Sequence, residues 1–79
     1  MNKNVLKIAI EIGRLVIDHP TYSDYDIGYR DGVRSAWEKY LSNNEIPFTP
    51  IICAGEETDA FFGYIDGFGA GVQVILSRA

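Results

Sequence analysis

The sequence predicts an all-α protein, a three-helix unit in which the second and third helices are glycine-striped copies of one another. A polar stripe at helical spacing predicts the first helix, and a repeat that places residue 23 on residue 58 predicts the other two. Because the chain has 79 residues, we expect one helical domain over residues 1–79 with a thin hydrophobic core. Small domains gain stability by association, so a homo-oligomeric helical bundle is expected.

The first predicted helix covers residues 4–18. Its polar residues recur at steps of four, three and four, which places them on one side of a helix: Lys7, Glu11, Arg14 and Asp18. The alternation over residues 6–12 also suits a strand, but it breaks at Gly13, whereas the polar stripe continues. His19 ends the helix because it precedes Pro20, and a residue before proline disfavours the helical region.

The second predicted helix covers residues 23–42, and the third covers residues 57–77. Thr21 or Ser23 is expected to cap the second helix, and the acidic residues that follow suit the positive end of the helix dipole. Residues 45–55 contain two prolines and predict a connecting loop, with a brief extended stretch at 51–53 as an open alternative.

The two repeated segments match without a gap. Seven positions are identical: Asp24 and Asp59, Gly28 and Gly63, Tyr29 and Tyr64, Asp31 and Asp66, Gly32 and Gly67, Leu41 and Leu76, and Ser42 and Ser77. The segment V-Q-V-I-L near the C-terminus could be a strand by itself. Its partner in the repeat, W-E-K-Y-L, lies in a clear helical pattern, and the repeat therefore predicts helix for both.

Small residues form a stripe on each repeated helix. The stripes consist of Gly28, Gly32 and Ala36 on one helix and Gly63, Gly67 and Gly71 on the other. Glycine inside a helix costs about 1 kcal/mol relative to alanine, so these glycines indicate a close approach of helix backbones. The sequence leaves open whether the stripes meet within one chain or across a twofold axis between chains.

Eight residues beside these stripes are candidates for binding a ligand or a partner. They are Tyr25, Tyr29, Arg30, Asp31, Arg34, Trp37, Tyr64 and Asp66. For Asp31 and Asp66, a structural hydrogen bond, for example to a tyrosine, is favoured over a symmetric ligand site, since buried polar groups are usually satisfied structurally. The two arginines suit either solvated ion pairs or the binding of an anion or an acidic partner.

The sequence contains no recognisable catalytic or metal-binding constellation. A single cysteine, Cys53, and a single histidine, His19, lack the spacing of zinc ligands, and we expect no catalytic residues, no metal and no cofactor. The lone cysteine excludes an internal disulfide and favours a reducing compartment. The run G-F-G-A-G does not match a dinucleotide-binding fingerprint.

Charge and hydropathy limit the partners. The net charge of −4 argues against binding to a nucleic acid duplex, which requires a basic surface. Residues 60–76 form the most apolar stretch, but it carries Asp66 and is shorter than the roughly 20 residues that span a bilayer. We therefore expect a cytoplasmic protein that does not enter membranes, acting in the host cytoplasm if it is viral.

These observations predict a non-enzymatic, homo-oligomeric interaction protein that serves as an inhibitor or adaptor of a larger complex. The type expected is a small viral protein that counters a host defence, although no resemblance to a named family is claimed. The alternative is an oligomer that sequesters a small anionic molecule, such as a nucleotide signal, in pockets at helix or subunit interfaces.

Overall fold

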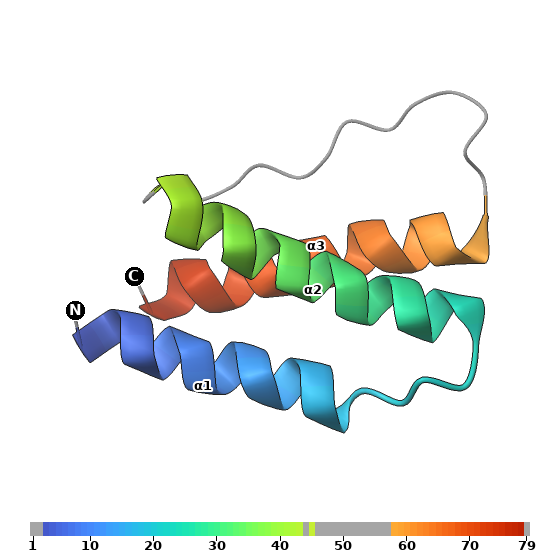
Figure 1. Ribbon diagram of the computed structural model, residues 1–79, viewed down its shortest axis with the longest axis horizontal. Coiled ribbons are helices and arrows are strands. Elements are labelled where there is room, and N and C mark those ends of the chain that lie inside the picture. Colours follow the sequence, from blue (N-terminus) through green and yellow to red (C-terminus); the bar gives the residue numbers. More distant parts are fainter. Residues whose placement is uncertain (1–2, 44, 46–57, 79) are drawn as a thin grey trace.

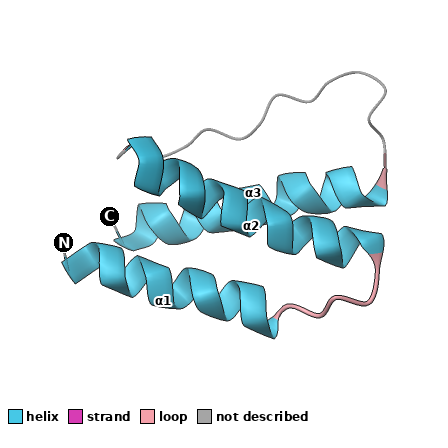
Figure 2. Ribbon diagram, viewed as in Figure 1, coloured by secondary structure: helices cyan, strands magenta, loops and turns pink. Residues whose placement is uncertain are grey.

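The computed structural model describes residues 3–43, 45 and 58–78, with side chains from Val5 onward. It contains three helices, α1 (Lys3–Asp18), α2 (Asp24–Asn43) and α3 (Asp59–Arg78), and the described residues include no strand (Figures 1 and 2). The predicted all-α, three-helix architecture is confirmed. The expected loop over residues 45–55, including Cys53, lies outside the described residues except for Glu45.

Equivalent residues cap the two repeated helices. The backbone N–H of Asp26 donates to Ser23 Oγ over 3.2 Å, and the backbone N–H of Phe61 donates to Thr58 Oγ1 over 3.1 Å. Each cap satisfies one of the N–H groups that a helix leaves unpaired at its start. Because the cap lies outside the helix, α2 begins one residue later than expected and α3 begins two residues later.

The glycine stripes of α2 and α3 face one another within one chain. A Cβ added to Gly28 would lie 2.0 Å from the carbonyl oxygen of Ala60, and one added to Gly67 would lie 1.9 Å from that of Tyr29. Gly32 faces the Tyr64 carbonyl in the same way, at 2.1 Å. Only glycine permits this approach, and the structure thereby answers the question that the sequence left open.

The two repeated helices run parallel. Gly28 lies against the start of α3, Gly32 lies one turn further along, and Gly71 meets Ala36 near the other end. Figure 1 shows both helices running in the same direction, so that the end of α2 and the start of α3 are far apart.

Helix α1 runs antiparallel to this pair and covers one side of it (Figure 1). The hydrophobic core lies where the three helices meet and consists of Ile8, Ile12, Val33 and Ile75. Partly buried hydrophobic residues surround it: Leu15, Val16, Tyr29, Trp37, Tyr40, Ala70 and Val74. Both α2 and α3 therefore contribute to the packing that holds α1 in place.

Helix α3 is the one helix of the described chain whose length and hydropathy would allow it to cross a membrane. Core helices of soluble proteins, which are mostly buried, and signal sequences share this property, and 28% of the most apolar part of α3 is buried here. Here the buried positions of α3 are used in packing, and they are Gly63, Gly67, Phe68, Gly71 and Ile75.

Candidate functional site: a groove between α1 and α3

The polar stripe of α1 lines a groove beside α3. The sequence identified this stripe, which consists of Lys7, Glu11, Arg14 and Asp18, only as a sign of a helix. In the structure each of the four residues borders at least one of two neighbouring cavities. The polar edge of α1 is therefore held next to the second half of α3, where a ligand can reach both helices.

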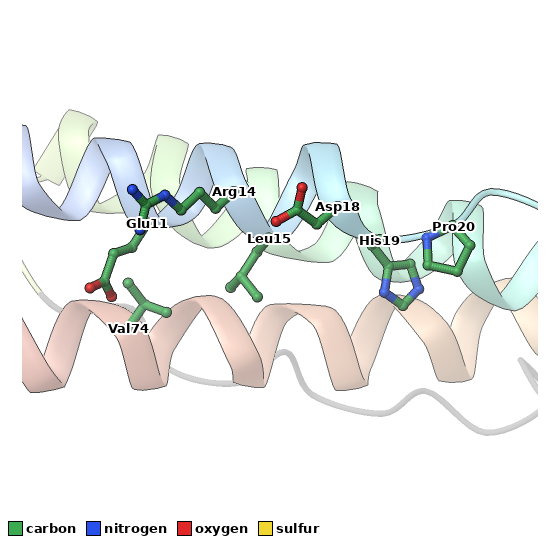
Figure 3. A pocket seen from close by; sticks show the side chains of 7 residues that line it. All are labelled: Glu11, Arg14, Leu15, Asp18, His19, Pro20 and Val74. Atoms are coloured by element: carbon green, nitrogen blue, oxygen red, sulfur yellow. The ribbon is translucent and has the colours of Figure 1, made fainter.

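The larger cavity has a volume of about 380 Å³. Its lining residues are Glu11, Arg14, Leu15, Asp18, His19, Pro20 and Val74. Figure 3 shows Leu15 of α1 and Val74 of α3 pointing into the space between the two helices, while Arg14 extends along α1. The cavity thus combines an apolar floor with a charged rim, which is the usual composition of a small-molecule site.

The smaller cavity has a volume of about 250 Å³ and a strongly basic lining. It is bordered by Lys7, Ile10, Glu11, Arg14 and Arg78. The guanidinium of Arg78 donates to Glu11 Oε1 and joins the end of α3 to the middle of α1. Glu11 and Arg14 line both cavities, so the two cavities adjoin one another along α1 and together make up the groove.

His19 closes the groove at the end of α1. Its Nε2 lies 3.1 Å from Asp26 Oδ1, and its ring stacks on Tyr29 with a centroid distance of 4.2 Å and an angle of 11°. Burial raises the pKa of Asp26, but hydrogen bonds from Ser23 and His19 outweigh it and hold the pKa below its ordinary value of 3.8. The imidazole is therefore fixed in position by α2.

One hydrogen bond joins two of the residues proposed from the sequence. The hydroxyl of Tyr25 donates to Asp66 Oδ2 across the α2–α3 interface. This hydrogen bond, followed by burial, raises the pKa of Tyr25 to about 12. It is the kind of structural role that the sequence favoured for Asp66. Asp31 is exposed, and the equivalent of Tyr25 in the repeat is Ala60, which has no hydroxyl to offer it.

The aromatic candidates on α2 are less available than expected. Tyr29 and Trp37 are half-buried and pack against the core, and Trp37 also stacks on Tyr40. Tyr64 is half-buried beside Phe68. Arg30 is half-buried with an unpaired Nε, whereas Arg34 is exposed.

None of the eight candidates lines the groove or the third described cavity, which lies along α2 from Ser35 to Asn43. The groove residues carried one sequence signal, the polar stripe of α1. Their pairing with Val74 and Arg78 depends on how α1 packs on α3, which the stripe does not encode.

Within the described part of the chain, no three His, Cys, Asp or Glu residues lie close enough together to hold a metal ion. No family model matches this chain, and no match is found among curated proteins or among solved structures.

Proposed function

We propose that this chain is a non-enzymatic interaction protein that associates with copies of itself and acts as an adaptor or inhibitor of a larger complex. The observation that supports this proposal is an exposed apolar stripe on α1. It consists of Leu6, Ile10, Gly13 and Ile17, and its three large side chains are 60%, 51% and 82% exposed.

The apolar stripe lies on the side of α1 that faces away from the core. Ile8 and Ile12, which point toward α2 and α3, are buried, whereas the stripe residues between and beyond them face solvent. The stripe residues recur at steps of four, three and four, the spacing at which one helix packs against another in a coiled coil. Such a surface is suited to a second copy of the same helix.

Gly13 supports a helix as the occupant. A Cβ added there would meet nothing within 4 Å, so packing within the chain does not require glycine at this position. By contrast, the glycines at the α2–α3 contact are required by packing, because a Cβ there would clash with the facing helix. Because a glycine in a helix costs about 1 kcal/mol, its place in the middle of an exposed apolar stripe favours close approach by another helix.

We therefore expect the oligomer to form through a different surface, the apolar stripe of α1. One of the two arrangements that the sequence left open pairs the glycine stripes between chains, but these stripes are already occupied within the chain. The physical motive is unchanged, since a small domain with a thin core gains stability by burying further apolar area. The alternative function, sequestration of a small ligand at Tyr29, Asp31 and Asp66, gains no support there because none of these residues lines a described cavity.

Light scattering coupled to size-exclusion chromatography tests the proposal. The wild-type chain is expected to elute at a multiple of its 8.8 kDa mass, and Leu6→Glu and Ile17→Glu are expected to elute as monomers. The matched control is Ile27→Glu, which places the same charge on an exposed apolar position of α2 and should leave the mass unchanged. Circular dichroism verifies that each variant remains helical.

Two outcomes would contradict self-association through α1. One is a wild-type chain that is monomeric over the whole accessible concentration range. The other is an assembly that survives both α1 substitutions, which would assign the interface to another surface. With the assembled form in hand, crosslinking in cells compared between wild type and Ile17→Glu identifies the larger complex on which the proposed inhibitor acts.

A further inference from the structure

We propose that the groove between α1 and α3 binds a small phosphate monoester whose organic part is flat, largely apolar and bears N–H donors, the chemistry of a nucleoside monophosphate. This site uses residues other than those first proposed for a ligand. Ile10 borders the basic cavity and also belongs to the apolar stripe, but Leu6 and Ile17, the two stripe residues substituted in the test of self-association, line neither cavity.

The basic end of the groove concentrates positive charge in an acidic protein. The chain has seven Lys and Arg residues against eleven Asp and Glu, yet three of the seven line the smaller cavity: Lys7, Arg14 and Arg78. One carboxylate, Glu11, is among them and pairs with Arg78. Among the described residues neither Lys7 nor Arg14 forms an ion pair. An anion would relieve the repulsion between these cations.

A phosphate monoester suits this arrangement better than a single negative charge. It carries up to two negative charges on three terminal oxygens, which can accept hydrogen bonds from several donors at once. Arginine presents planar, paired N–H groups that match phosphate oxygens, and lysine adds a compact charge. The exposed Arg14 and Lys7 lie about two helical turns apart on the same side of α1.

The adjoining cavity can accept the organic part of the same ligand. It shares Glu11 and Arg14 with the basic cavity, so it lies within reach of the organic part of a molecule held by Arg14. Leu15, Val74 and Pro20 provide apolar contacts, and the volume of about 380 Å³ falls within the range of small-molecule sites. A simple inorganic anion would leave this apolar space unused.

The far end of the groove favours hydrogen-bond donors. Asp18 supplies a carboxylate that accepts N–H groups and repels a second anion, and the phosphate is thereby directed toward Arg78. His19 adds a ring whose position is fixed by Asp26 and Tyr29. A rigid wall of this kind lowers the cost of ordering the site on binding. A nucleobase is flat and carries N–H donors, which fits this end.

Isothermal titration calorimetry with three probes tests the site: adenosine 5′-monophosphate, adenosine and inorganic phosphate. We expect the monophosphate to bind more tightly than either of its parts. Arg14→Gln should raise its Kd at least tenfold, whereas Arg34→Gln, which removes an exposed cation from α2, should leave the Kd unchanged. Asp18→Asn should weaken binding of the monophosphate and leave the binding of inorganic phosphate unchanged.

Three outcomes would overturn the proposal. The first is a wild-type chain that does not bind the monophosphate at millimolar concentration. The second is a single Kd shared by Arg14→Gln and Arg34→Gln. The third is inorganic phosphate that binds as tightly as the monophosphate, which would remove the organic part from the site. Leu6→Glu and Ile17→Glu should retain the wild-type Kd even as monomers, so that the failure of self-association and the failure of this site are distinguished.

Discussion

At Gly67 there is room for a hydrogen atom on Cα but not for a methyl group, and this is what allows α2 and α3 to approach closely. A methyl group there would lie 1.9 Å from the backbone carbonyl oxygen of Tyr29, and the same holds within a few tenths of an ångström at Gly28, Gly32 and Gly63. Because the atom in the way belongs to the backbone, it cannot move aside as a side chain would. Glycine Cα–H groups so close to carbonyl oxygens add weak hydrogen bonds to the packing.

We predict opposite effects for two alanine substitutions only two residues apart. Gly67→Ala should lower the free energy of unfolding by about 1–3 kcal/mol through overpacking, despite the better helix propensity of alanine. Gly69→Ala should raise it by about 0.5–1 kcal/mol, since a Cβ at Gly69 meets nothing within 4 Å. Urea unfolding of the two variants measures both values. Equal effects would show that α2 and α3 do not touch at Gly67.

The larger substitution Gly67→Leu follows from the same contact. The sequence alone predicts that it disrupts assembly between glycine stripes. Since the stripes meet within one chain, the expected result is instead the separation or unfolding of the α2–α3 pair itself.

Tyr25 provides a titration test of the α2–α3 interface. Its pKa is raised from 10.0 to about 12, chiefly by its hydrogen bond to Asp66. A raised pKa stabilises the folded chain fully below pH 10, and this contribution is lost as the pH rises through about 12. Ultraviolet absorbance titration should show one tyrosine ionising late, and Asp66→Asn should return it toward 10. Asp31→Asn is the control from the equivalent position and should leave the late ionisation in place.

At the scale of elements, α1 depends on a small number of specific attachments. It is fixed at its middle by the ion pair of Glu11 with Arg78 and at its end by His19, which contacts Asp26 and Tyr29 of α2. Between α2 and α3, by contrast, the two backbones approach so closely that a Cβ on any of four glycines would meet a backbone carbonyl oxygen. The attachments of α1 therefore govern the shape of the groove.

The joint between α1 and α2 should weaken in acid. The folded chain holds the pKa of Asp26 below 3.8, so the carboxylate stabilises the fold above that pH, and the contribution is lost as the pH falls through the lowered pKa. The urea midpoint should fall between pH 5 and pH 2, and Asp26→Asn should flatten that dependence. Asp24→Asn, at an exposed acid in the same turn, should retain the wild-type slope.

At the scale of the whole molecule, α1 breaks the symmetry of the repeat. The α2–α3 pair consists of two equivalent parallel helices, and α1 lies against only one side of it (Figure 1). Its inner face completes the core, its polar edge forms the groove, and its outer face carries the apolar stripe. Both proposed interactions of the protein are thus located on the helix that lies outside the repeat.

The sequence determined the helices and the positions of the two glycine stripes, because these follow from local periodicity and from a repeat that can be compared with itself. It also offered Ser23, beside Thr21, as the cap of the second helix, a role that requires only the next three residues. It did not locate the groove. Lys7 and Arg14 belong to the polar stripe of α1, but Arg78 is separated from them by most of the chain, and no local pattern links it to them.

Tertiary structure alone decided that the glycine stripes pair within one chain, that the paired helices run parallel, and that the polar edge of α1 faces α3. Each of these depends on how three helices far apart in the sequence pack together. The arrangement that buries the most apolar area decides the relative direction of α2 and α3 and the side of the pair that α1 covers. The local sequence determines which polar and apolar surfaces each helix carries. Only the packing of the whole molecule determines which of those surfaces remain exposed.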